Sequence, residues 1–233
     1  MPRARSKKQD DRQTAAFYEN GSGCLSLYSL SILSVMLIIC LITALALNAP
    51  INTSAASSVN SINSTNSANI SPIFTHEVQY WARDITRWAN AASLDPNLVA
   101  VVLQIESCGN PSALSRAGAL GLFQVMPFHF HFGENPYDPD TNALRGLSYL
   151  TRSLQAANGN AHLALAGYNG GIGVISRYEW TWPAETKRYI YYGVPIYEDA
   201  RSGATSSPML DEWYQKYGAG LCRNASQRLG LSN

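Results

Sequence analysis

The sequence predicts an all-α fold for the part of the 233-residue chain that follows Pro72. Apolar residues recur there at helical spacing, and no stretch of alternating polar and apolar residues favours a strand. Asp or Ser followed by Pro, a typical start of a helix, occurs at Asp95-Pro96, Asp138-Pro139 and Ser207-Pro208. Hydrophobic residues make up 46% of the chain, which is enough for the core of one domain.

The N-terminal part of the chain is predicted to meet a membrane. Residues 1–24 are rich in Arg and Lys, and the run from Leu25 to Leu47 holds no charged residue. At a rise of about 1.5 Å per residue, residues 25–47 are long enough to cross a hydrocarbon core of roughly 30 Å. We expect a signal anchor, with residues 1–24 in the cytoplasm and the rest outside the cell membrane. Because Ala44-Leu45-Ala46 also resembles a cleavage site, a secreted form is the alternative.

A linker is expected between this segment and the folded part. Residues 48–72 are rich in Ser, Asn and Ala and almost free of charge, so they cannot bury enough apolar surface to fold. Over the whole chain, 17 Lys and Arg residues oppose 16 Asp and Glu residues, and the basic excess lies before Leu25. Without a basic face on the folded part, we expect no nucleic-acid partner.

Short connections separate the expected helices. One helix is expected to begin at Asp95, and the others are expected at 76–92, 138–157, 160–168, 183–200 and 208–217.

Glu106 is the first candidate for a catalytic role, because it lies at the edge of an apolar stripe. In the helix that begins at Asp95, this stripe consists of Leu98, Val101, Val102 and Ile105. Partial desolvation at the edge would raise the pKa of Glu106 above the roughly 4.3 of a free Glu, so that it holds a proton for a leaving oxygen. Helix geometry alone, however, favours a solvated Glu in the last turn.

Three later motifs accompany Glu106-Ser107. They are GLFQVMP at 121–127, ALAGYNGG at 164–171, and Glu185-Thr186 followed by Tyr189. In this order the four motifs resemble the soluble lytic transglycosylases, a family of lysozyme-like enzymes that cleave peptidoglycan. The resemblance covers about 73–197 and implies a catalytic domain of the goose-type lysozyme fold over 73–200. It leaves 201–233 as a C-terminal helical extension packed on that domain.

The resemblance also implies roles for single residues. Glu106 would be the catalytic acid and base, and the substrate would be held by Ser107, Gln124, Met126, Tyr168, Asn169, Glu185 and Tyr189. Two positions depart from the family pattern. Phe123 replaces the usual Met, and Gly167 replaces the usual Ala before Tyr-Asn; neither change removes a polar group that the chemistry needs.

The implied reaction is the non-hydrolytic cleavage of the β-1,4 bond between MurNAc and GlcNAc. No obvious second carboxylate accompanies Glu106, since Asp138 is explained as a helix cap and the other acidic residues considered as surface charge: Glu134, Asp140, Glu198 and Asp199. A single carboxylate suffices if the 6-hydroxyl of the substrate attacks and closes a 1,6-anhydro ring. No cofactor is then required. The alternatives are a lysozyme- or chitinase-like hydrolase on the same fold and a wall-binding module without turnover.

His129, His131 and the cysteines complete the candidate residues. The two histidines lack a third ligand at recognisable spacing, so we expect no metal. Cys108 and Cys222 follow the apolar run and would lie outside the cell, where disulfides persist. We expect them to pair, the alternative being two unrelated buried thiols. The expected partners are peptidoglycan glycan strands and, through 25–47, the membrane, with the chain as a monomer.

Overall fold

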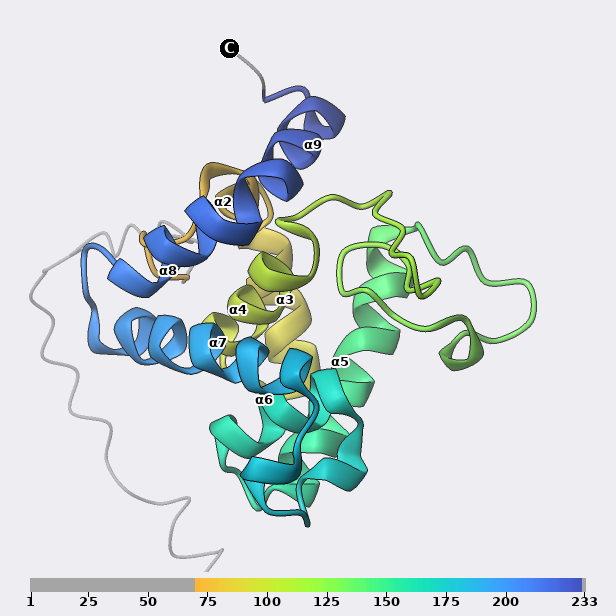
Figure 1. Cartoon of the computed structure of the whole chain (residues 1–233). Coiled ribbons are helices and arrows are strands. Elements are labelled where there is room, and N and C mark those ends of the chain that lie inside the picture. Colours follow the sequence, from red (N-terminus) through yellow and green to blue (C-terminus); the bar gives the residue numbers. More distant parts are fainter. Residues whose placement is uncertain (1–69, 232–233) are drawn as a thin grey trace, which may run out of the picture. The chain divides into compact units, whose positions relative to one another are not determined.

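The computed structural model describes residues 70–231 (Figure 1). The expected cytoplasmic segment 1–24, the expected membrane span 25–47 and nearly all of the expected linker 48–72 lie outside the described residues. Within 70–231, no helix is both long enough and apolar enough to cross a membrane.

The described residues are helical and contain no strand beyond isolated bridges at Leu114, Leu120 and Val125, so the all-α prediction is confirmed for them. The α-helices are α2 (His76–Tyr80), α3 (Ala82–Ala92), α4 (Pro96–Ser107), α5 (Pro139–Ala156), α6 (Ala161–Gly170), α7 (Ala184–Ser202), α8 (Pro208–Trp213) and α9 (Ala219–Leu229). Short 3-10 helices lie at Pro127–His129, Ile172–Val174 and Glu179–Thr181, and a π-helix, η4, lies at Tyr214–Gly218.

The three predicted helix caps are present. The side chain of Asp95 accepts from the amide of Asn97 at 2.8 Å, and that of Asp138 accepts from the amide of Thr141 at 2.8 Å. Ser207 accepts from the amide of Leu210 at 3.3 Å. Each cap satisfies an amide that has no partner inside its own helix, which fixes where α4, α5 and α8 begin.

Two predicted helix ranges need correction. The range 76–92 is divided at Trp81, whose indole nitrogen donates to the carbonyl of Gly109 at 2.8 Å and holds the backbone in a turn. The range 208–217 is too short, since the helical path continues through η4 and α9 to Leu229. Gly218 makes this path possible, because a Cβ there would overlap the ring of Trp213.

The centre of the fold is α4. The residues from Val99 to Leu103 are fully buried, including Val99, Ala100 and Leu103, which lie outside the predicted apolar stripe. Helices α3, α7 and α9 contact α4, and α6 packs between α5 and α7 (Figure 1). As a result the last turn of α4, with Glu106, is held by elements that come from both ends of the described chain.

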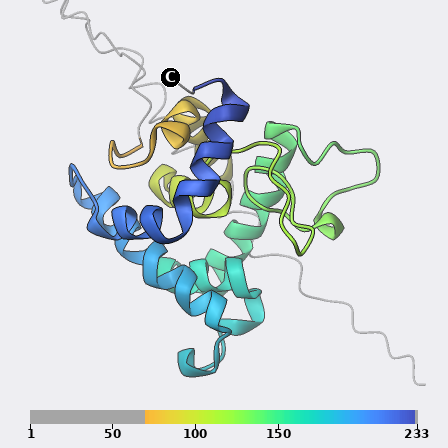
Figure 2. The same cartoon turned by 45° about the horizontal axis from the view of Figure 1, so that its top comes forward.

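The C-terminal helices close over the start of the described chain. Helix α9 contacts α2 and α4, and Figure 2 shows α9 (dark blue) beside α2 (orange). The predicted disulfide between Cys108 and Cys222 is present and joins the residue after α4 to α9. The hydroxyl of Ser226 donates to Glu77 at 2.5 Å, so a second, noncovalent contact fixes α9 on α2.

Candidate active site

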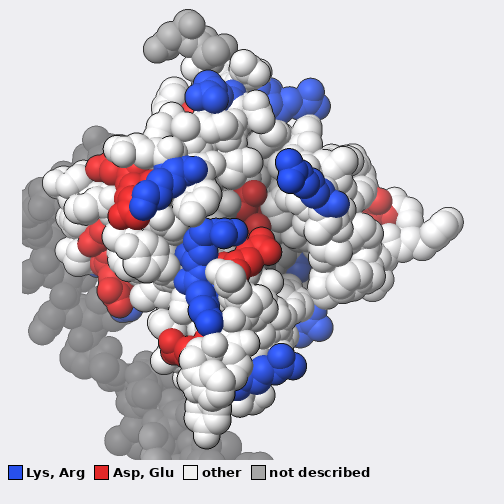
Figure 3. All heavy atoms as spheres, viewed as in Figure 1, with Lys and Arg blue, Asp and Glu red and all other residues white. Residues whose placement is uncertain are grey.

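A groove with Glu106 at its centre runs across the molecule. It consists of two adjoining cavities, which we call the Tyr149 cavity, of about 440 Å³, and the Tyr217 cavity, of about 310 Å³. The residues that line both are Glu106, Ser115, Gln124, Asn169 and Glu185. On the face shown in Figure 3, acidic and basic side chains lie close together and form no large patch of one sign. Because the two cavities adjoin at Glu106, the groove can receive a chain that extends to both sides of this residue.

Glu106 lies in the last turn of α4, which ends at Cys108 with a left-handed backbone (φ 53°). Although its side chain keeps some exposure, the surrounding protein withdraws the carboxyl from water and raises its pKa from 4.5 to about 8. Desolvation is the largest cause of this rise, the nearby Tyr189 hydroxyl lowers the carboxyl pKa, and the charge of Glu185 raises it further. At neutral pH the carboxyl is thus mostly protonated.

The Tyr189 hydroxyl is buried beside this carboxyl. Its contact with Glu106 lowers the carboxyl pKa, yet no group within 70–231 meets full hydrogen-bond geometry with it. The contact is therefore a loose one. Burial, followed by the charge of Glu106, also keeps the pKa of Tyr189 well above its usual value, so the hydroxyl retains its proton.

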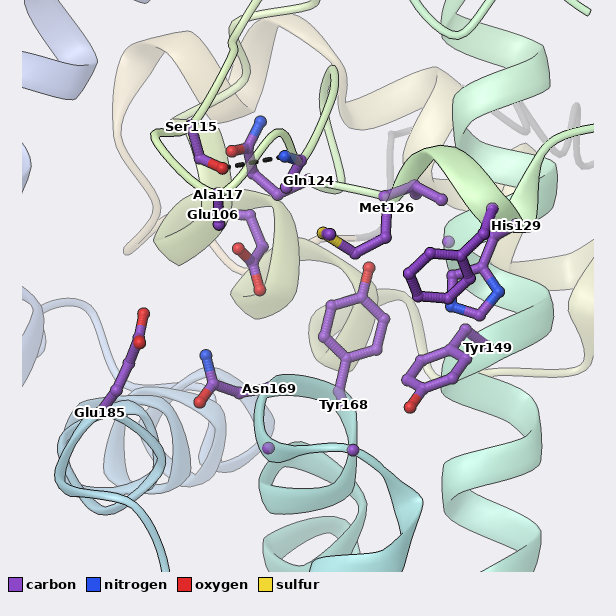
Figure 4. A pocket seen from close by; sticks show the side chains of 16 residues that line it. Glu106, Ser115, Ala117, Gln124, Met126, His129, Tyr149, Tyr168, Asn169 and Glu185 are labelled. Carbon is purple, nitrogen blue, oxygen red and sulfur yellow. Dashed lines mark hydrogen bonds between the residues drawn. The ribbon is translucent and has the colours of Figure 1, made fainter.

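Tyr168 and Asn169 come from α6 and face Glu106 across the groove (Figure 4). The Tyr168 hydroxyl donates to the carbonyl of Phe123 at 2.7 Å, which ties α6 to the GLFQVMP loop. Asn169 accepts a hydrogen bond at Oδ1 from the hydroxyl of Thr186 at 2.9 Å. Because Oδ1 is occupied, the amide nitrogen of Asn169 is left on the side of Glu106, as Figure 4 shows.

Gln124 and Met126 bring the GLFQVMP loop to the groove. Gln124 has a left-handed backbone (φ 47°), and its Nε2 donates to the carbonyl of Gly121 at 2.9 Å. This bond holds the side chain in place, and no hydrogen bond within 70–231 uses Oε1, which can accept from a ligand hydroxyl. Paired backbone bonds of 3.0 Å between Leu120 and Val125 hold the loop in this conformation.

Ser107 is the one predicted substrate contact that the structure does not bring to the groove. It is fully buried, its Oγ donates to the carbonyl of Leu122 at 2.7 Å, and it accepts from the amide of Gly109 at 3.1 Å. Through its bond to Leu122, Ser107 fixes the end of α4 against the GLFQVMP loop.

Several lining residues were not identified from the sequence. In the Tyr149 cavity they include Ser115, Phe128, His129 and Tyr149, and in the Tyr217 cavity Leu114, Arg188, Trp213, Tyr217 and Leu221. His129, considered above as a metal ligand, has its ring in tilted contact with the rings of Phe128 and Tyr149. Burial, together with the charge of Arg152, lowers the His129 pKa, so its imidazole is neutral at physiological pH. These residues come from loops and from several separate helices, α5, α7, α8, η4 and α9, so no local pattern in the sequence marks them as one site.

Part of the chain is similar to known transglycosylases. Residues 84–190 match the profile of the family described as Transglycosylase SLT domain. The transglycosylase of Enterobacteria phage PRD1 is 39% identical over 111 residues, which cover 47% of this chain and 40% of that protein. The membrane-bound lytic murein transglycosylase C of Edwardsiella ictaluri is 28% identical over 115 residues, which cover 40% of this chain and 32% of that protein.

Among solved structures, lytic transglycosylase Slt from Pseudomonas aeruginosa aligns with a TM-score of 0.43 and 24% identity, covering 54% of this chain and 24% of that one. The chain spans less than half the length of the relatives named above. The order of motifs around Glu106 agrees with the match over 84–190: this part of the chain is similar to the transglycosylase SLT domain.

Proposed function

We propose that the chain is a peptidoglycan lytic transglycosylase, which cleaves the MurNAc–GlcNAc bond without water. The observation that carries the proposal is Glu106, a carboxyl with a pKa of about 8 in the middle of a groove that continues on both sides. An acid in this position can protonate an internal bond of a polymer. The relatives described as transglycosylases support the same activity.

In the proposed reaction, protonated Glu106 gives its proton to the glycosidic oxygen, and the bond between that oxygen and the anomeric carbon breaks. Glu106 is then a carboxylate in a desolvated site, which makes it a stronger base than a solvated Glu. It takes the proton from the 6-hydroxyl of the same muramoyl sugar, whose oxygen bonds to the anomeric carbon and closes the 1,6-anhydro ring. No water is consumed, and Glu106 ends the cycle protonated.

The positions of the residues around Glu106 suggest a role for each of them. The Asn169 amide nitrogen, on the side of Glu106, would donate to the substrate or to the carboxylate, and Tyr189 would stabilise the carboxylate once it forms. Gln124 and Met126 would contact sugars in the groove. Tyr168 would fix the GLFQVMP loop through Phe123, and Ser107 would position the end of α4.

A hydrolase on the same fold is the second candidate, and Glu185 favours it. The sequence offered no second catalytic carboxylate, yet Glu185 lines both cavities with Glu106 and its charge raises the Glu106 pKa. Hydrolysis of glycosidic bonds ordinarily uses two carboxylates, one of which activates water or attacks the sugar. In the transglycosylase reaction Glu185 would only bind substrate.

Two amide variants distinguish these candidates and a binding module. Purified sacculi are digested with wild type, Glu106→Gln and Glu185→Gln, and the released muropeptides are identified by mass. We expect anhydro ends from wild type, none from Glu106→Gln, and anhydro ends from Glu185→Gln. Reducing ends from wild type together with an inactive Glu185→Gln would establish the hydrolase. Binding of sacculi without any products from wild type would indicate a binding module.

Peptidoglycan lies outside the cytoplasmic membrane, so the proposed substrate requires an exported domain. We propose that residues 25–47 anchor a monomeric chain with residues 48–72 as a tether and residues 73–200 as the catalytic domain. The Edwardsiella relative is described as membrane-bound. Fractionation of cells that express the full chain is expected to place it in the membrane, resistant to a high-salt wash, and recovery of a form that begins after Ala46 would show a secreted one.

A further inference from the structure

The Tyr217 cavity is built in part by residues beyond the SLT domain. The match to the family profile ends at residue 190, whereas Tyr192, Trp213, Tyr217 and Leu221 lie after it and line this cavity. The C-terminal extension is therefore one wall of the groove, immediately beside Glu106.

This wall is fixed relative to Glu106. The disulfide joins Cys222 of α9 to Cys108, two residues after Glu106. The hydroxyl of Tyr192 in α7 donates to Glu212 in α8 at 3.1 Å. Both connections hold the extension in place, so it can present side chains to a substrate without first being ordered by it.

The π-helix η4 places one aromatic ring against α7. π-helices are rare and often occur at functional sites. Here η4 holds Tyr217, which is 49% exposed and whose ring lies 5.7 Å from the ring of Tyr192, edge to face. The guanidinium carbon of Arg188 lies 5.2 Å from the centre of the Tyr217 ring. The stacking holds an otherwise flexible cation at the groove.

Arg188 is exposed and no ion pair within 70–231 uses its charge. Even Glu185, one turn earlier on α7, is beyond ion-pair distance. A planar guanidinium held in this way suits a carboxylate, which it can bind with two parallel hydrogen bonds. Leu114 and Leu221, both exposed, add apolar surface beside it.

We propose that Arg188, stacked on Tyr217, binds a carboxylate of the peptide stem that the muramoyl sugar carries. This inference rests on the proposed function, because it takes peptidoglycan as the substrate. The sugars and their N-acetyl groups are neutral, while the stem brings carboxylates and short apolar side chains. A cation flanked by apolar residues therefore fits the stem better than the glycan.

Binding of soluble fragments to the full chain tests this proposal. The Glu106→Gln variant serves as the background, so that no fragment is cleaved. Three fragments of equal length are compared: one with intact stems, one whose stem carboxylates have been converted to amides, and one without stems, which has a free lactyl carboxylate. We expect intact stems to bind about tenfold more tightly than amidated ones, the size of one exposed charge-assisted contact.

Adding Arg188→Met to this background is expected to remove the tenfold difference between intact and amidated stems and to leave binding of the amidated fragment unchanged. Arg188→Lys, which keeps the charge, is expected to retain part of the difference. Arg201→Met is the matched control, because Arg201 also stacks on a tyrosine of α7, Tyr197, but does not line the groove. Equal binding of intact and amidated stems, or an equal loss for both with Arg188→Met, would overturn the proposal.

The third fragment separates the two sources of a carboxylate. Arg188-dependent binding of the fragment without stems, as tight as that of intact stems, would assign the contact to the lactyl group and overturn the assignment to the stem. Because these measurements need no turnover, they also separate the two proposals. A wild type that binds stems through Arg188 but releases no cleavage products would leave this inference standing and remove the proposed activity.

Discussion

The hydroxyl of Thr186 donates to Oδ1 of Asn169 at 2.9 Å and thereby decides which end of the Asn169 amide faces Glu106. Thr186 is buried, and a Cβ on Gly170 would lie 2.6 Å from its hydroxyl, so α6 and α7 meet closely at this point. The Glu185-Thr186 pair thus has two separate functions in the structure: Glu185 lines the groove, and Thr186 orients a neighbour that does so.

Thr186→Val is predicted to lower kcat by about tenfold with a smaller change in KM. The substitution keeps the shape but removes the donor, so Asn169 loses the partner that fixes its amide, at a cost of about 1 kcal/mol or more. Steady-state rates on soluble glycan strands give kcat and KM for wild type and variant. Thr186→Ser retains the hydroxyl and is expected to keep most of the activity; equal losses in both variants would indicate packing instead of orientation.

Glu106→Gln is predicted to stabilise the protein, increasingly with pH. The folded-state pKa of Glu106, about 8, lies above the 4.5 of a free group, so wild type loses stability as pH rises from about 4.5 to about 8. Because Gln does not ionise, the variant does not lose this stability. In wild type the free energy of unfolding falls by up to about 1.4 kcal/mol per pH unit within that range. Urea unfolding is expected to give wild type and Glu106→Gln nearly equal free energies of unfolding near pH 4.5. Near pH 8 we expect the variant to be more stable by roughly 2 to 4 kcal/mol. A difference that does not change with pH would contradict the raised pKa.

Tyr189→Phe is predicted to move the alkaline limb of the pH–rate profile to higher pH. Activity needs protonated Glu106, so kcat/KM of wild type is expected to fall as pH rises through about 8. The Tyr189 hydroxyl lowers the Glu106 pKa, and its removal therefore raises that pKa further. Tyr197→Phe, in which the lost hydroxyl bonds to Asp95 away from the groove, is expected to leave the limb in place. A limb that stays or moves to lower pH in Tyr189→Phe would speak against this role.

Loss of the disulfide is predicted to destabilise the protein by about 2 to 5 kcal/mol, since it closes a long loop in the unfolded chain. Its cysteines are 114 residues apart, and both are fully buried. The double variant Cys108→Ala, Cys222→Ala is compared with wild type by urea unfolding, with and without a reductant. We expect reductant to affect only wild type; an unchanged unfolding midpoint in the double variant would refute a stabilising role.

The parts of the fold that depend on neighbouring residues could be predicted from the sequence. The caps at Asp95, Asp138 and Ser207 use amides two or three residues away, so the local sequence contains both partners. The apolar stripe made a desolvated Glu106 possible, but helix geometry alone favoured a solvated one, and only the accompanying motifs indicated a catalytic carboxyl. The extent of its desolvation could not be predicted, because α4 is buried around its whole circumference by α3, α7 and α9, which no helical pattern specifies.

Few features that depend on contacts distant in sequence could be predicted from residue patterns. The disulfide between Cys108 and Cys222 was one, and the resemblance implied a role for Glu185. Tyr217 gave no such signal, because it reaches the groove only where the extension folds back past Glu106. Gly167, a departure from the family pattern, has its cause in packing, because a Cβ there would lie 2.7 Å from the side chain of Ile175. Ser107 adjoins Glu106 in the chain but turns into the core, since successive residues of a helix point about 100° apart.

The most direct test of the central claim is digestion of sacculi by wild type in heavy-oxygen water, followed by mass analysis of the muropeptide ends. If Glu106 directs attack by the 6-hydroxyl, the new ends are anhydro sugars, lighter than reducing ends by one water and without heavy oxygen. Reducing ends that carry the heavy oxygen would show that water attacks, and would contradict the account.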